Sequence, residues 1–206
     1  DLARPKFAIM NPEITYTLPD YQTQCGCADI MMHTMERYFV LEDTMEITDK
    51  IAQDVMKNVM KYAKILKKDP ENYEARAEIM WCGSLSHNGL TGCGTCGGDW
   101  ATHLIEHELG GMFDVAHRAG LAAVWGSWAR YVMDEKPERF AQFAVDVMGV
   151  EESDDVKSTA LKGIEAVEEF YRMIEMPTNM KELGINPTDE QIKDMAMKAT
   201  NHDTQQ

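Results

Sequence analysis

Asp29 and His33 are the first residues along the chain whose types and spacing suit the binding of a metal ion. They lie four positions apart in CADIMMHTMERYF, so on a helix both side chains project from one face about one turn apart. A carboxylate and an imidazole placed in this way can share one cation. A solvated helix face or a hydrogen bond between the two side chains is the alternative explanation for the same spacing.

Three further histidines, His103, His107 and His117, gather in the segment DWATHLIEHELGGMFDVAHRAG. On one unbroken helix His103 and His117 would be separated by about 21 Å, at roughly 1.5 Å per residue, which is too far to share an ion. The pair of glycines at 110–111 predicts a break, after which the chain can bring His117 back toward His103. Together with the carboxylate and imidazole of the first segment, these side chains form a nitrogen and oxygen ligand set that suits Fe(II) or Zn(II).

The letters HLIEH allow a different interpretation. His103, Glu106 and His107 match the inverted metallopeptidase pattern H-x-x-E-H, in which two histidines bind zinc and the glutamate acts as a general base. This alternative leaves Asp29, His33 and His117 without a role. It remains open at the level of the sequence.

The cysteines offer a third possible metal site. Cys25-x-Cys27 and Cys93-x-x-Cys96 together could supply four thiolates for zinc. However, Cys25 and Cys27 would point to different sides of a helix, and Cys93 and Cys96 fall in a glycine-rich loop without the βαβ context of a redox motif. We therefore expect free thiols, and an odd total of five cysteines suits a reducing compartment.

The elements that must position these residues are predicted to be almost entirely helical, because apolar residues recur at helical spacing along most of the chain. The predicted helices cover 20–41, 48–67, 71–90, 99–112, 117–134, 137–148, 153–175 and 188–201. Thr48 and Ser153 are the predicted N-caps of two of them, and Pro137 fits the first turn of a third. A short strand-like segment is expected over 6–10, and a loop over the glycine-rich stretch 89–98.

Composition narrows the class of protein. Among 206 residues, 35 acidic side chains outnumber 20 basic ones and give a net charge of −15, which disfavours nucleic acid as a partner. No apolar run approaches the roughly 20 residues that span a bilayer, and the first residues do not resemble a signal peptide. We expect a soluble, cytoplasmic protein. Because the sequence starts at Asp1 and runs directly into an apolar stretch, we also expect it to be a truncated chain.

The ordered segments NPEITYTLP, GCADIMMHTMERYF, HNGL and DWATHLIEHELGGMFDVAHRAGLA resemble the iron-containing alcohol dehydrogenases, particularly the butanol-dehydrogenase-like branch that acts on alcohols and aldehydes. The resemblance covers nearly the whole chain. It implies an all-α, multi-helix C-terminal domain of the iron-type alcohol dehydrogenase, or dehydroquinate synthase-like, fold. Residues 1–18 would be an extended N-terminal segment and 19–206 the helical metal-binding catalytic domain.

The same resemblance implies roles for individual residues. Four residues would bind one divalent metal, most readily Fe(II) with Zn(II) as the alternative: Asp29, His33, His103 and His117. His107 would be catalytic and would face the substrate and the nicotinamide, and Thr17 and Leu18 would touch the cofactor.

The intact enzyme would transfer hydride between a primary alcohol and NAD or NADP, and would associate as a homo-oligomer, most simply a dimer. The family's α/β nucleotide-binding domain, with its glycine-rich turn, is not found in these 206 residues. We therefore expect this fragment alone to be inactive. A helical metal-binding domain without catalysis of its own is the alternative function.

Overall fold

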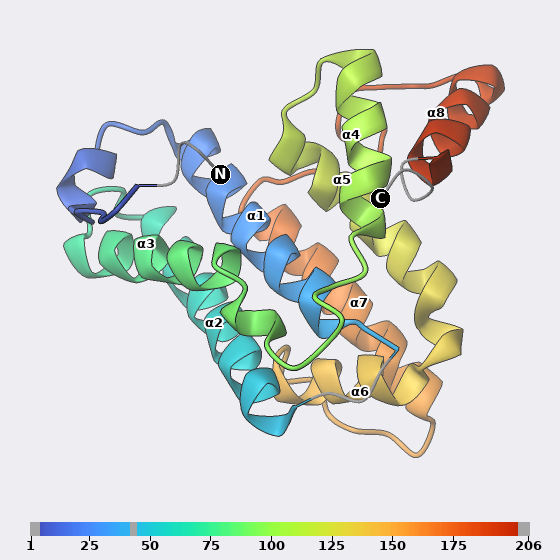
Figure 1. Ribbon diagram of the computed structural model, residues 1–206, viewed down its shortest axis with the longest axis horizontal. Helices are drawn as coiled ribbons and strands as arrows, with labels where there is room; N and C mark the ends of the chain where they lie inside the picture. The colour runs from blue at the N-terminus through green and yellow to red at the C-terminus, as the bar shows by residue number, and fades with distance from the viewer. Residues whose placement is uncertain (1–4, 42–44, 202–206) are drawn as a thin grey trace.

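Eight α-helices make up most of the described part of the chain, which covers residues 5–41 and 45–201 of the computed structural model (Figure 1). They are α1 (Asp20–Tyr38), α2 (Glu46–Leu66), α3 (Tyr73–His87), α4 (Ala101–Phe113), α5 (His117–Val132), α6 (Pro137–Asp146), α7 (Val156–Met173) and α8 (Asp189–Asn201). Short 3-10 helices lie at Pro12–Thr15, Leu90–Gly92 and Met133–Glu135. The predicted all-α fold is confirmed, and each predicted helix has a counterpart. None of the described helices is long and apolar enough to cross a membrane.

Helix α1 occupies the middle of the arrangement and carries the first candidate ligands (Figure 1). It contacts α2 and α3 on one side and α5 on the other, while α5 also contacts α7 and α4. Met31, Met32 and Met35 of α1 are fully buried in the main hydrophobic core, where flexible thioether side chains fill the space between helices. Because α1 packs against several helices, its backbone is held in place, and so are the positions of the side chains that face α4 and α5.

Two of the predicted helix ends are wrong. Helix α2 begins at Glu46, so Thr48 lies inside its first turn, where the hydroxyl donates a hydrogen bond to the carbonyl oxygen of Cys93 at 2.8 Å. Helix α7 is capped by Asp155, whose carboxylate accepts from Lys157 N, rather than by Ser153. Asp155 directly precedes α7, so its carboxylate, and not the Ser153 hydroxyl, caps the helix. Pro137 does occupy the first turn of α6, as predicted.

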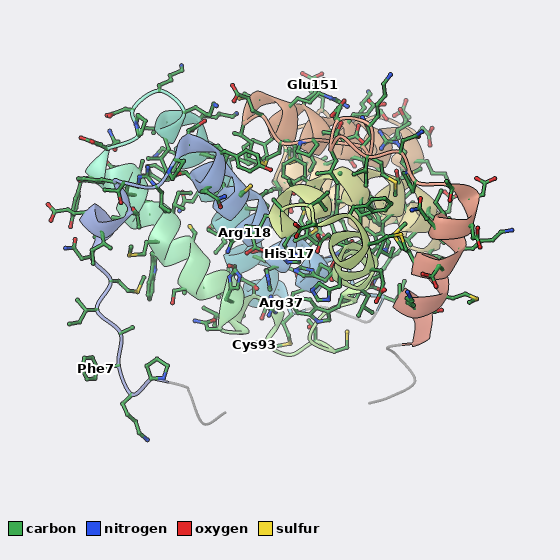
Figure 2. All side chains as sticks on the ribbon, turned by 90° about the horizontal axis from the view of Figure 1, so that it is seen from above. Phe7, Arg37, Cys93, His117, Arg118 and Glu151 are labelled. Carbon is green, nitrogen blue, oxygen red and sulfur yellow. The ribbon has the colours of Figure 1, made fainter. Side chains whose placement is uncertain are left out.

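The strand expected over residues 6–10 does not form. The described residues contain no strand at all, and Phe7 and Ile9 are 79% and 83% exposed. Figure 2 shows Phe7 on a segment that extends away from the helices. A strand needs a neighbouring strand to satisfy its backbone groups, and this helical domain offers none.

Candidate metal centre

Asp29 and His33 lie on consecutive turns of α1, as their spacing predicts. His33 Nε2 is 3.6 Å from Asp29 Oδ1, and both side chains are largely buried, with 19% and 10% of their surface exposed. The Oδ1 atom of Asp29 is buried and has no hydrogen-bond partner. An unpartnered carboxylate oxygen in the interior is costly unless a cation or donor meets it.

His103 of α4 comes directly beside this pair. Its ring centroid is 4.6 Å from that of His33, and the residue is 6% exposed. Neither of its ring nitrogens has a hydrogen-bond partner. Ligand atoms of Asp29, His33 and His103 all lie within 4.8 Å of one another, which is a spacing that one ion can bridge.

The start of α4 explains how His103 reaches α1. Trp100, the N-cap, has a left-handed backbone with φ of 63°, and its indole nitrogen donates to Gly97 O at 3.1 Å. Gly98 lies against α1 so closely that a Cβ there would be 3.2 Å from the carbonyl oxygen of Glu36. The tight loop therefore places the first turn of α4 against α1. The Trp100 ring then packs edge-on against both His33 and His103.

His117 is the first residue of α5 and lies close to this group, with its ring centroid 5.5 Å from that of His103. The turn that brings it back is not at the glycines at 110–111, which stay inside α4. The helix continues to Phe113 and is capped by Asp114, whose backbone is left-handed with φ of 53°. The prediction of a break was right, but its position is three residues further along the chain.

His107 lies one turn after His103 on α4 and is exposed. Its ring centroid is 5.3 Å from that of His117 and 6.2 Å from that of His103. Ligand atoms of Glu106, His107 and His117 form a second group within 4.8 Å. The two histidines of the H-x-x-E-H pattern thus fall into different groups, which disfavours a metallopeptidase site built on His103 and His107.

Two buried carboxylates, those of Glu36 and Glu106, lie next to His103 and His117. The sequence alone did not place them there. Glu36 Oε1 accepts a hydrogen bond from the backbone N–H of His103 at 3.2 Å and lies 3.3 Å from His103 Nδ1. Glu106 Oε2 is hydrogen-bonded to His117 Nδ1. The available signal was helical spacing, because Glu36 follows His33 by three residues and Glu106 follows His103 by three.

His87 and Arg118 are two further neighbours, and neither is among the predicted ligands. His87 Nε2 is 3.6 Å from Asp29 Oδ2, and its ring centroid is 3.9 Å from that of His33. Arg118 Nε donates to Asp29 Oδ2 at 3.0 Å. Figure 2 labels His117 and Arg118 next to each other over the middle of the molecule. His33, His87, His103 and His117 therefore come together from four helices, and His107 lies beside His117.

The protonation states of Asp29 and His33 suit cation binding. Burial, together with the neighbouring His87 and His103, lowers the pKa of His33 to about 3, so its ring is neutral and can act as a ligand. Burial alone raises the pKa of the Asp29 carboxyl, but hydrogen bonds from His87 and Arg118 outweigh it and lower the pKa overall. The hydrogen bond to Glu106 raises the pKa of His117.

The residues present fit a divalent metal ion. Buried, unpartnered Asp29 Oδ1 and both unpartnered ring nitrogens of His103 are donor atoms that no protein group satisfies. Neutral imidazoles and one ionised carboxylate are ligands that Fe(II) and Zn(II) accept. The cysteines take no part in a comparable cluster among the described residues, and Cys93 and Cys96 are exposed.

The predicted cofactor contacts lie at the mouth of a neighbouring groove. Leu18 is 44% exposed and lines a groove of about 300 Å³ between the start of α1 and α3, whereas Thr17 is exposed in the turn beside it. Arg118, whose guanidinium contacts Asp29, also lines this groove.

Comparison with known proteins identifies the family of this chain. Residues 23–206 match the family model described as "Fe-containing alcohol dehydrogenase family, C-terminal". The chain is 36% identical over 186 residues to NADH-dependent butanol dehydrogenase A of Clostridium acetobutylicum, covering 90% of this chain and 48% of that protein. It is 34% identical over 184 residues to the NADPH-dependent aldehyde reductase YqhD of Escherichia coli, covering 89% and 47%.

The solved structures of similar proteins show the same fold. The crystal structure of NADH-dependent butanol dehydrogenase A from Thermotoga maritima superposes with a TM-score of 0.88 at 36% identity, over 95% of this chain and 48% of that one. Aldehyde reductase YqhD from E. coli, free of substrate and cofactor, gives a TM-score of 0.90 at 30% identity, over 98% and 52%. The chain spans about half the length of the curated relatives it matches.

Proposed function

Because this chain belongs to the iron-containing alcohol dehydrogenase family, as its C-terminal domain, we propose that it binds one divalent metal ion and forms the catalytic half of an NAD(P)-linked alcohol dehydrogenase or aldehyde reductase. The observation that carries the proposal is the meeting of Asp29, His33 and His103, whose ligand atoms lie within 4.8 Å of one another. His117, at the adjoining end of α5, is the fourth proposed ligand.

The ion would supply Lewis-acid polarisation of an alcohol or aldehyde oxygen during hydride transfer. Fe(II) is the metal that we propose first, with Zn(II) as the alternative. The protein's part is to keep Asp29 ionised, to keep His33 neutral, and to exclude water from the side of the site that faces α1. Burial of His103 at 6% exposure serves the last of these purposes.

His107 is the proposed proton-transfer residue. It is exposed, lies one turn beyond His103 on α4, and has its ring 5.3 Å from His117. An imidazole at this position can pass a proton between the buried site and water at neutral pH. The same exposed position allows it to face both the substrate and the nicotinamide.

The groove lined by Leu18 and Arg118 is the proposed contact surface for the nicotinamide end of the cofactor, with Thr17 at its rim. The relatives are described as NADH-dependent and as NADPH-dependent enzymes, so either cofactor is compatible with membership of the family. The adenine and pyrophosphate would be held by an N-terminal α/β nucleotide-binding domain of the whole protein, which we propose to be a cytoplasmic homodimer.

Metal binding by alanine variants tests the ligand set. In the 206-residue chain, alanine at any one of the four proposed ligands should weaken the binding of Fe(II) or Zn(II). The loss should exceed the roughly 10–100-fold that is typical for a residue that only hydrogen-bonds to a ligand. The four positions are Asp29, His33, His103 and His117. His107→Ala is the matched control, since it removes a histidine of the same helix. It should keep one equivalent of metal in a competition titration with a chromophoric chelator.

Turnover tests the reaction. In the full-length protein, His107→Ala should retain metal and lose most of the activity with butanol plus NAD or NADP, and with butyraldehyde plus the reduced cofactors. Loss of metal in His107→Ala with retention in His117→Ala would refute the ligand assignment and favour the H-x-x-E-H site.

A further inference from the structure

We propose that Glu106 is a positioning residue of the metal centre, which fixes the ring of His117 by accepting a hydrogen bond from its Nδ1–H. The Nε2 atom is then the nitrogen presented to the ion. This inference rests on the proposed function, because it assumes that His117 is a ligand. It assigns a task to a buried carboxylate that the reaction itself does not use.

Glu106 is an expensive residue to bury. It is 1% exposed, and Oε1 has no hydrogen-bond partner. The hydrogen-bond partner found for its side chain in the described part of the chain is His117, through Oε2. A buried carboxylate costs stability unless it is well paired, so pairing with one half-exposed imidazole is a poor arrangement for stability alone. It is a good arrangement for holding one ring orientation and one tautomer.

The two helices leave space for this carboxylate by using glycine on either side. A Cβ at Gly120 of α5 would lie 2.6 Å from Glu106 Oε1 and 2.8 Å from its Cγ. A Cβ at Gly110 of α4 would lie 3.2 Å from the same oxygen. The contact at Gly120 is too short for a side chain at residue 120 unless Glu106 shifts from its present position beside His117.

His103 also has a buried carboxylate close to its ring, although the ring itself is not hydrogen-bonded. Glu36, which is 2% exposed, accepts from the backbone N–H of His103 and lies 3.3 Å from its Nδ1. Each of the two proposed ligands outside α1 therefore has a buried carboxylate behind its Nδ1 atom. Of the two, the carboxylate of Glu106 is hydrogen-bonded to the imidazole, and such a carboxylate both orients a metal-binding ring and increases its basicity.

A second metal ion bound by Glu106, His107 and His117 is the rival explanation, because their ligand atoms also lie within 4.8 Å of one another. The geometry favours positioning. The unpartnered Oε1 of Glu106 lies against Gly110 and Gly120, and Oε2 is already hydrogen-bonded to the Nδ1 of His117. The two explanations differ in metal stoichiometry.

Metal affinity of the 206-residue chain is the test, measured with Zn(II) or Co(II) by chelator competition. Glu106→Ala should weaken binding about 10–100-fold and keep one equivalent of metal. Glu106→Gln retains an acceptor oxygen, so it should recover a large part of that loss. Glu168→Gln on α7 is the control, because it removes a largely buried carboxylate that pairs with Arg130, away from the site. It should leave the affinity unchanged.

Two double variants make the test specific. In a His117→Ala background, Glu106→Ala should cause no further loss of affinity, because the residue acts through that ring. Gly120→Ala should weaken metal binding as Glu106→Ala does. The double variant Gly120→Ala/Glu106→Ala should bind metal with the same affinity as Glu106→Ala alone. The double variant removes the side chain that a Cβ at residue 120 would meet, so it can be measured even where Gly120→Ala folds poorly.

The tautomer of His117 gives an independent readout, since ¹⁵N spectra distinguish Nδ1–H from Nε2–H. At a pH above the raised pKa of His117, where the ring is neutral, the wild-type metal-free protein should hold Nδ1–H, and Glu106→Ala should show a mixture. Unchanged affinity in Glu106→Ala, or an additive loss in the His117→Ala background, would overturn the proposal. Two equivalents of metal in the wild type that fall to one in Glu106→Ala would establish the second metal site instead. Absence of metal binding by the wild type would defeat the proposed function itself.

Discussion

Arg118 Nε donates a hydrogen bond to Asp29 Oδ2 at 3.0 Å and so links the first turn of α5 to the middle of α1. The other oxygen of the same carboxylate, Oδ1, is buried and has no partner. Arg118 therefore neutralises Asp29 from one side and leaves the oxygen on the other side for a cation. The guanidinium and the proposed metal ion share one negative charge.

We expect Arg118→Met to destabilise the metal-free chain by about 1–2 kcal/mol, because the buried carboxylate loses a charge-assisted hydrogen bond. The same change should tighten divalent metal binding a few-fold, since a cation that competes for Asp29 is removed. Urea unfolding in the presence of a chelator and a competition titration measure the two effects. A loss of affinity as large as that of Asp29→Ala would show that Arg118 mainly orients the carboxylate.

Much of this arrangement follows from the sequence. The eight helices were predictable from apolar periodicity, and the family resemblance was confirmed by the match over residues 23–206. The pairing of Asp29 with His33 follows from i, i+4 spacing within one helix. Local pattern is sufficient for these features, because each depends on neighbours in the same helix.

The parts that the sequence did not reveal depend on contacts between helices. Arg118 looks like an ordinary surface residue until α5 is packed on α1, and nothing in the pattern around Glu106 separates a positioning role from the general base of H-x-x-E-H. The turn was misplaced for a related reason. Packing keeps both glycines at 110–111 in α4, and Asp114 adopts the left-handed conformation instead.

An ion-pair network between α1, α2 and the end of α7 should make stability depend on pH. Lys67 Nζ lies 2.7 Å from Asp20 Oδ2 and 3.0 Å from Glu175 Oε2. Burial of the Asp20 carboxyl tends to raise its pKa, but hydrogen bonds from Lys67 and Gln24 outweigh burial and lower the pKa. The contribution of Asp20 is therefore present above its unfolded pKa of about 3.9 and is lost as the pH falls through the lower folded value.

Asp20→Asn should accordingly reduce the free energy of unfolding by about 0.5 kcal/mol at pH 7, a small value because the Asp20 side chain is 39% exposed and screened by solvent. The difference from wild type should shrink toward zero at pH 3, measured by urea unfolding with a chelator present. Asp54→Asn, which removes a pair with Lys57 at 73% exposure, is the control and should have little effect at either pH. An equal difference at both pH values would contradict the assignment.

The cysteines of the glycine-rich loop should have no part in metal binding. Cys93 and Cys96 are exposed, and the Sγ of Cys93 is directed to the carbonyl oxygen of Gly89 at 3.6 Å. Replacing both by Ser should leave the metal content of the freshly purified chain unchanged, as measured by elemental analysis. Loss of about one equivalent of zinc in this double variant would mean that thiolates bind the ion.

The 206 residues taken alone should fold and bind metal, yet show no dehydrogenase turnover. The described residues contain no strand, so they form no strand-to-helix glycine turn of the kind that holds a dinucleotide pyrophosphate. The glycine-rich stretch 89–98 is a loop with one 3-10 turn. Gly92 and Gly98 pack against α1, and Cys93 accepts a hydrogen bond from α2, instead of forming an anion cradle. Contacts from the groove at Leu18 would be too few to hold the cofactor.

Rate should suffer as well as affinity, because misplacing the hydride donor by about 1 Å can cost on the order of a hundredfold. The assay uses the metal-loaded chain with butanol plus NAD or NADP, and with butyraldehyde plus the reduced cofactors. The metal-loaded full-length protein serves as the positive control. The His107→Ala variant of that protein tests whether the assay can detect low residual turnover. Turnover by the 206 residues comparable to that of the full-length protein would show that the helical domain carries a dinucleotide site of its own.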